Sequence, residues 1–189
     1  MLKIARLSTG KSLALSLLAA VGLTFTANLL LQSFSTTTWA RPKLQRQTDR
    51  LQGLGNLRKT ALNLANRDRR KLGLSALTAD PLLHKVAQLY AEDMLRRNYF
   101  SHYNPEGKTV VDRYAALGGQ GTPGENLAIL QHPPAAFVPP NASLLAFFEQ
   151  GWMGSPTHRP NLVNPKATRF GFGIAGNSDR IYAVQTFGI

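Results

Sequence analysis

Two histidines and one glutamate are the residues of this sequence best suited to chemistry. His102 and His158 lie in segments that neither a helical nor a strand pattern explains, and Glu125 follows a glycine at the entrance of a short strand. Taken singly, each has an ordinary interpretation: His102 caps a helix end, Glu125 is a surface acid, and His158 makes a hydrogen bond within its loop. If the fold brings them together, two neutral imidazoles and a carboxylate suit a divalent cation such as Zn²⁺ and leave positions for water.

Other catalytic arrangements have less support in the sequence. Ser101 and Ser155 each lie close to one of the two histidines, yet neither serine stands in a Gly-x-Ser-x-Gly turn and no orienting acid is apparent. His84 falls in the register of an amphipathic helix, which indicates a partly buried histidine, and His132 precedes two prolines in a loop. Because there are no cysteines, the sequence excludes a disulfide framework and a thiolate metal site.

The segments that would position these residues are mainly helical in the first two thirds of the chain. Residues 57–72 predict a helix that ends at Gly73. The next begins at Pro81 after the N-cap Asp80, and its apolar pairs repeat at helical spacing as far as Leu95, so we expect it to be the central buried helix. Shorter helices are predicted over 109–117 and 141–153, with Asp112 and Arg113 facing solvent on the first of these.

The C-terminal part changes to a strand pattern. Apolar residues alternate over 170–174, turn formers follow at 176–179, and a run at 181–187 completes a predicted hairpin; 125–130 is a further short strand. Helices therefore precede strands without a regular βαβ alternation. This order predicts an α+β domain with an antiparallel sheet.

The N-terminal region predicts export. Residues 1–40 start with three cations and continue into an apolar stretch centred on 13–31, which is the layout of a secretory signal peptide. We expect cleavage near Ala40, with a retained N-terminal anchor as the alternative; in both cases the domain that follows lies outside the cytoplasm. The expected location is secreted, periplasmic or at the cell envelope.

A basic segment follows the predicted signal. Residues 41–72 hold ten Lys and Arg against two Asp, a net charge of 10 − 2 = +8, and the first part, 41–56, is predicted to be a linker. Such a segment can bind an anionic envelope surface, such as wall polymers or lipid head groups, through charge alone. The alternative is a solvated linker followed by the polar face of a helix. Export and the lack of interleaved aromatic residues disfavour nucleic acid.

Several short motifs occur in a set order from residue 66 to the C-terminus. They are the run at 66–74 that ends in Leu72-Gly73-Leu74, Ala91-Glu92-Asp93-Met94, Phe100-Ser101-His102, Gly124-Glu125-Asn126-Leu127-Ala128, Trp152-x-x-Ser155-Pro156-x-His158-Arg159-x-Asn161-Leu162, Gly171-x-Gly173 and Val184-Gln185-Thr186-Phe187-Gly188. Together they resemble the CAP superfamily (SCP/TAPS; cysteine-rich secretory, antigen 5 and pathogenesis-related proteins), most closely its cysteine-poor bacterial branch. The resemblance covers the predicted domain, residues 57–189.

The resemblance implies a three-layer α-β-α sandwich with a central antiparallel sheet, and a cleft with two histidines and two glutamates. His102, Glu125 and His158 match three of the four positions, and these are the expected metal ligands, zinc being the foremost candidate. The fourth position, three residues after the tryptophan, is Ser155 in this chain. Glu149 is six residues away from it, about 240° around a helix, and is expected to point elsewhere.

The expected function is an exported or cell-envelope CAP domain that binds a small-molecule or lipid ligand and a divalent cation in its cleft. One alternative is a metal-dependent hydrolase or peptidase, which the missing second glutamate disfavours because it removes a natural general base. Another is a docking module led by the basic segment. Glu125 can also simply hydrogen-bond an imidazole and fix its tautomer, which would make the three residues a structural network without metal.

Overall fold

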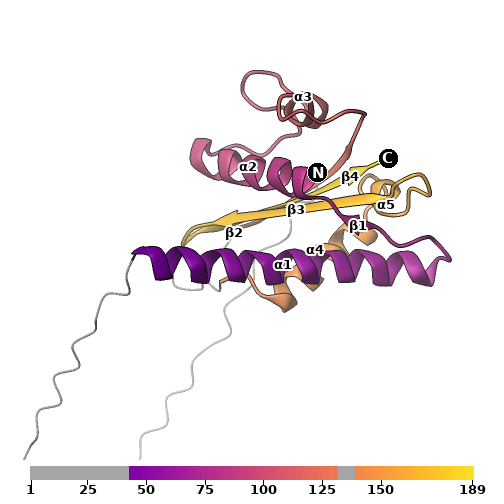
Figure 1. The fold of residues 1–189 in the computed structure, drawn as a ribbon, viewed down its shortest axis with the longest axis horizontal. Helices are drawn as coiled ribbons and strands as arrows, with labels where there is room; N and C mark the ends of the chain where they lie inside the picture. The colour runs from indigo at the N-terminus through magenta and orange to yellow at the C-terminus, as the bar shows by residue number, and fades with distance from the viewer. Residues whose placement is uncertain (1–42, 132–138) are drawn as a thin grey trace, which may run out of the picture.

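The computed structural model describes residues 43–131 and 139–189, with side chains from residue 53 onward (Figure 1). The predicted signal segment 1–40 and His132 lie outside the described residues. Within the described part of the chain, no helix is both long and apolar enough to cross a bilayer.

Five helices are described in this part of the chain. Their bounds are α1 Lys43–Lys71, α2 Pro81–Arg97, α3 Val110–Ala115, α4 Ala142–Met153 and α5 Arg159–Leu162. The first four confirm predicted helices, although α1 begins inside the segment expected to be a linker. The sequence analysis missed α5, which is one short turn in a stretch of turn-forming residues.

Local chemistry explains where α2 begins and ends. The carboxylate of Asp80 accepts hydrogen bonds of 2.8 and 3.0 Å from the backbone amides of Leu82 and Leu83, which have no partner inside the helix. Pro81 occupies the first helical position, where no amide hydrogen is needed. At the other end Asn98 adopts a left-handed conformation with φ of 54° and stops the helix.

Four strands form one sheet in the order β1-β3-β4-β2. Their bounds are β1 Thr78–Ala79, β2 Gly124–Gln131, β3 Arg169–Gly176 and β4 Arg180–Gly188. The β3–β4 hairpin and β2 confirm the predicted strands. Strands β2 and β3 flank β4, and each pairs with it antiparallel. Only β1, a two-residue strand that the sequence analysis missed, runs parallel to its neighbour.

The sheet is the middle layer of a three-layer sandwich (Figure 1). Helix α2 covers one face, where its buried residues pack on Leu127, Tyr182 and Val184. Helices α1 and α4 cover the other face over an aromatic core that includes Phe148 and Trp152. This arrangement confirms the predicted α-β-α sandwich.

The contact between α2 and β3 is unusually close. A Cβ atom at Gly171 or Gly173 would lie 2.3 Å from the α2 backbone, so only glycine fits at these positions. Beyond the short β1, the edge of β3 is covered by side chains. The backbone amide of Phe172 donates to Nδ1 of His84 (2.9 Å), its carbonyl accepts from Nε of Arg58 (3.2 Å), and the amide group of Gln88 bonds both backbone groups of Ile174.

Candidate functional site

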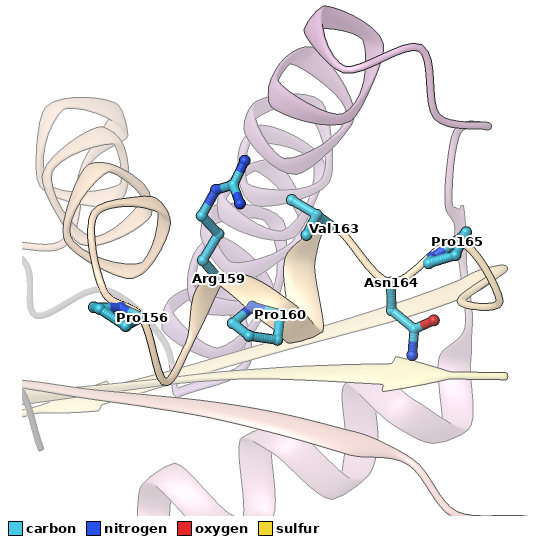
Figure 2. Close-up of a pocket in the computed structure, with 6 residues that line it drawn as sticks. All are labelled: Pro156, Arg159, Pro160, Val163, Asn164 and Pro165. Carbon is cyan, nitrogen blue, oxygen red and sulfur yellow. The ribbon is translucent and has the colours of Figure 1, made fainter.

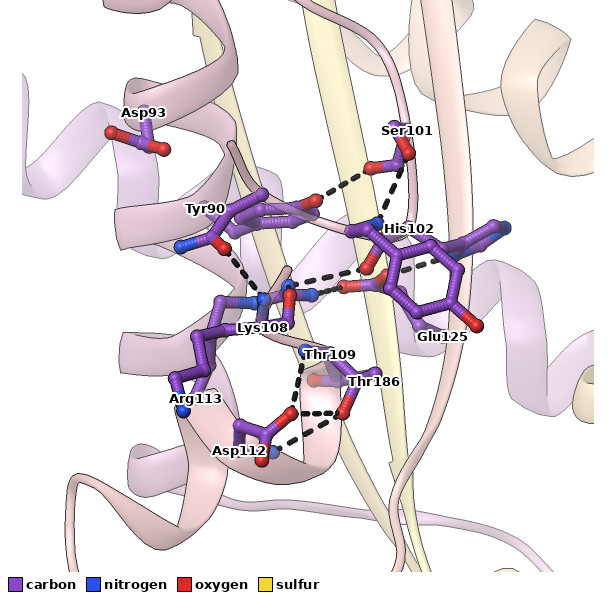
Figure 3. A network of polar contacts seen from close by, with 12 residues as sticks. Tyr90, Asp93, Ser101, His102, Lys108, Thr109, Asp112, Arg113, Glu125 and Thr186 are labelled. Carbon is purple, nitrogen blue, oxygen red and sulfur yellow. Dashed lines mark hydrogen bonds and ion pairs between the residues drawn. The ribbon is translucent and has the colours of Figure 1, made fainter. Parts of the chain in front are cut away.

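Glu125 lies at the centre of a polar network at the start of β2 (Figure 3). Its Oε1 lies 2.8 Å from Nδ1 of His102, and its Oε2 accepts a hydrogen bond of 2.5 Å from Nη2 of Arg113. The Glu125 side chain is 2% exposed, whereas the His102 side chain is 53% exposed. A buried carboxylate is thus neutralised by a cation on one oxygen and orients an accessible imidazole with the other.

Arg113 does not face solvent, and the prediction that it would was wrong. Its Nη1 donates to the backbone carbonyls of His102 (3.3 Å) and Lys108 (3.0 Å), and its Cζ lies 3.3 Å from the ring centre of Tyr90 (Figure 3). The prediction failed because the long Arg113 side chain reaches back to the chain after α2, whereas Asp112 beside it is exposed as predicted. The guanidinium joins α2, α3 and β2 at one point.

Tyr90 supports this arrangement from the inner face of α2. The residue is 1% exposed, and its hydroxyl donates a hydrogen bond of 2.5 Å to the backbone carbonyl of Ser101. Burial raises the pKa of Tyr90 to about 12, so the phenol remains a donor at all physiological pH values. Tyr90 therefore holds the segment that carries His102 while its ring face contacts the Arg113 cation.

His158 is buried at the start of α5, where it is the N-cap residue. Its Nδ1 lies 2.7 Å from Oγ of Ser155 and 3.3 Å from Oγ1 of Thr157. Burial lowers the pKa of His158, so its imidazole stays neutral to lower pH than an ordinary histidine. Ser155, which stands where the family pattern has its second glutamate, is the group that orients this ring.

The structure joins His102 directly to Glu125, and it places His158 on a separate hydrogen-bonded turn. Within residues 43–131 and 139–189, no three His, Asp or Glu side chains converge closely enough to share a metal ion. In both rings Nδ1 is engaged, and Nε2 makes no hydrogen bond to another described residue. Each ring thus leaves one nitrogen, Nε2, without a hydrogen bond to another described residue. Both oxygens of Glu125 are already engaged, which favours its role as an orienting group over that of a third ligand.

Asn161 connects the two parts of the site, a role that the sequence analysis did not assign. Its Nδ2 donates to the backbone carbonyl of Glu125 (3.0 Å) and to Oδ1 of Asn126 (2.8 Å). Gly124 leaves room for this contact, since a Cβ there would lie 2.9 Å from Oδ1 of Asn161. The asparagine belongs to the motif that follows Trp152, but no pattern in the sequence indicates its partners.

A surface hollow lies beside this turn (Figure 2). It has a volume of about 400 Å³ and is lined by Pro156, Arg159, Pro160, Val163, Asn164 and Pro165. The hollow adjoins His158 in sequence, but its lining contains neither histidine nor Glu125. It is therefore distinct from the two imidazoles.

Comparison with known proteins identifies relatives over most of the described chain. The CAP family model, described as the cysteine-rich secretory protein family, matches residues 62–187. The uncharacterised protein YkwD of Bacillus subtilis is 34% identical over 131 residues, which cover 69% of this chain and 46% of YkwD. The chain thus spans less than half the length of that curated relative.

Two solved structures resemble the fold. An extracellular protein of Bacillus anthracis that contains an SCP domain is 28% identical, with a TM-score of 0.56 over 70% of this chain and 40% of its own. An outer surface protein of Borrelia burgdorferi is 23% identical, also with a TM-score of 0.56, over 68% of this chain and 90% of its own. The second likeness concerns the fold alone.

Proposed function

Because the chain belongs to the CAP family of cysteine-rich secretory proteins, we propose that it is an extracytoplasmic CAP domain that binds a divalent cation and a small-molecule or lipid ligand beside His102 and His158. The location is supported by the charged and apolar layout of residues 1–40 and by the extracellular SCP-domain protein of Bacillus anthracis that it resembles. Zinc is the foremost cation because imidazole nitrogen is among its preferred ligands.

The observation that carries the proposal is the way each imidazole is oriented. Glu125 engages Nδ1 of His102 and Ser155 engages Nδ1 of His158, at 2.8 and 2.7 Å. Metal-binding histidines commonly have the second ring nitrogen fixed in this way. The carboxylate of Glu125 only accepts, so it places the proton of His102 on Nδ1 and leaves Nε2 as ligand. The hydroxyl of Ser155 leaves Nε2 of His158 as ligand when it accepts from Nδ1. Water or the bound ligand would complete the coordination of a cation held by two nitrogens.

The environment of His158 affects how its imidazole responds to acid. His102 has a carboxylate partner, whereas His158 has a hydroxyl partner and a pKa lowered chiefly by burial. An imidazole must be neutral to bind a metal, and His158 therefore stays competent to lower pH than an exposed histidine. Cation affinity should fall as the pH drops through about 6, where an ordinary histidine takes up its proton.

Binding is favoured over hydrolysis because no carboxylate at the site is available as a base. Glu125 has both oxygens engaged, one of them by the Arg113 guanidinium. The contact between Ser155 and His158 has the length of a nucleophile–base pair, but it uses Nδ1 of an imidazole that no described acid orients. Ser155 is therefore assigned to holding the ring.

Zinc titration by calorimetry at pH 7.5 tests the proposal. The wild type is expected to bind one equivalent, and His102→Ala and His158→Ala should each abolish stoichiometric binding. Glu125→Gln should weaken binding about 10- to 100-fold, the usual effect of a group that orients a ligand. His132→Ala is the matched control, because the sequence places that histidine in a loop before two prolines. Equal binding by the His102→Ala, His158→Ala double variant would refute the site.

A further inference from the structure

Glu149, on the inner side of α4, is a buried carboxyl that the cation site does not use directly. The residue is 1% exposed; its Oε2 accepts a hydrogen bond of 2.6 Å from Nε2 of Gln185, and its Oε1 has no partner among the described residues. Burial raises the pKa of Glu149 to about 7, and among nearby charges Asp68 raises it further while Arg67 lowers it. Leaving this carboxyl half-satisfied costs free energy of folding.

Three buried or half-buried amide side chains lead from Glu149 to the candidate site. We call Gln185, Asn126 and Asn161 the amide chain. Gln185 and Asn126 are paired across β4 and β2, where Oε1 of the first accepts from Nδ2 of the second at 3.2 Å. Asn126 then accepts from Asn161 at 2.8 Å, and Asn161 also donates to the carbonyl of Glu125 at 3.0 Å. Each amide of the chain therefore donates to the next group on the way to Glu149: Asn161 to Asn126, Asn126 to Gln185, and Gln185 to the carboxylate.

Two groups that only accept hydrogen bonds explain this common direction: the carboxylate of Glu149 at one end and the backbone carbonyl of Glu125 at the other. An ionised carboxylate only accepts hydrogen bonds, whereas an amide can turn over and exchange its donor and acceptor ends. Gln185 must present its NH₂ to Glu149, and its oxygen is then left for the NH₂ of Asn126; the same rule orients Asn161. If Asn161 turned over, its oxygen would face the carbonyl of Glu125 and that bond would be lost.

We infer that Glu149 is a positioning residue that holds the amide chain in one orientation and thereby fixes α5, which begins at His158, against the strand that carries Glu125. The inference rests on the proposed function for its effect on the cation site. An amide at position 149 could accept from Gln185 as well, and without a buried charge, but it could also donate. The carboxylate is the side chain that allows one orientation alone, and protonation removes that restriction.

The test uses NMR of the side-chain amide groups in the metal-free ¹⁵N-labelled protein. Wild type at pH 8 should give one set of signals for Asn126 and Asn161. In Glu149→Gln these signals should shift or double, and in the wild type the same change should appear as the pH falls through about 7. The control is Glu92→Gln, an exposed carboxyl on α2 whose removal should leave both signals unchanged. Zinc affinity should fall about 3- to 10-fold in Glu149→Gln, less than for a direct imidazole partner.

Each outcome decides the inference. The pH-dependent change must disappear in Glu149→Gln, whose histidines still titrate; if it persists there, the histidines cause it and the inference is overturned. Unchanged amide signals in a variant with altered thermal stability would make Glu149 a purely structural residue. Should Glu149→Gln fail to fold, the pH series of the His102→Ala, His158→Ala double variant decides instead: the change must persist without these two histidines, and its loss overturns the inference. Absence of zinc binding in the wild type would refute the proposed cation site, while the amide signals would still report on Glu149.

Discussion

Replacing Glu149 by glutamine should change the free energy of unfolding in a pH-dependent way. The stability of the variant minus that of the wild type should be larger at alkaline pH than at acid pH. Burial raises the pKa of Glu149 from 4.5 to about 7, so between these values the folded protein holds a proton that the unfolded chain has released. The free energy of unfolding then decreases as the pH rises. This contribution is fully present below pH 4.5 and lost above pH 7. The pKa values of the unfolded and folded states are 4.5 and about 7. At about 1.4 kcal/mol for each pKa unit, this difference corresponds to about 3 kcal/mol.

Urea unfolding of wild type and Glu149→Gln at pH 4.5, 6 and 8 measures this effect. The variant lacks the titrating group and keeps an oxygen that can accept from Gln185, so its stability minus that of the wild type should increase by about 2 to 3 kcal/mol from pH 4.5 to 8. The subtraction cancels other titrating groups, including His158. The exposed Glu92→Gln control should show a flat difference. A difference for Glu149→Gln that is constant within about 0.5 kcal/mol would refute the reasoning, because it would mean that the carboxyl has no raised pKa.

Three further changes test other parts of the molecule. Arg113→Met should lower the free energy of unfolding by about 3 kcal/mol at pH 7, because it leaves Glu125 as a buried carboxylate without its cation; urea unfolding measures this, and a loss below about 1 kcal/mol would contradict the role of the pair. Ser155→Ala should release Nδ1 of His158 and mix its two tautomers, which ¹⁵N NMR detects; unchanged ring nitrogen shifts would show that Thr157 suffices. Deletion of residues 41–52, which keeps the contact of Leu54 with the core, should weaken binding to anionic vesicles at low salt and leave thermal unfolding nearly unchanged, and binding that is insensitive to salt would contradict a charge mechanism.

The main elements of the fold were predictable because their sequences carry a clear period. The apolar pairs after Pro81 repeat with the helix, and the residues of the β3–β4 hairpin alternate with the strand. The elements that were missed have too few residues to show a period. Strand β1 has two residues, both exposed, and is defined by backbone pairing to β3; α5 has four residues.

The site was predictable to the extent that it rests on motifs. The ordered motifs indicated His102, Glu125 and His158, and the structure joins the first two directly. Arg113 was assigned to the wrong side, since six helical residues do not reveal which face is covered. The role of Glu149 on α4 depends on Gln185, which lies 36 residues away on β4, and no local pattern encodes such a partner.

The covered edge of β3 has a consequence for how this domain behaves in acid. An open strand edge is a template for pairing with another chain, and here Arg58, His84 and Gln88 occupy it as a further strand would. His84 can accept the amide hydrogen of Phe172 only while its Nδ1 is unprotonated, and burial keeps its pKa low. Acid strong enough to protonate His84 turns that nitrogen into a donor and uncovers the edge. Protection of this edge against pairing with another chain thereby depends in part on the protonation of one imidazole, while Arg58 and Gln88 keep their bonds to β3.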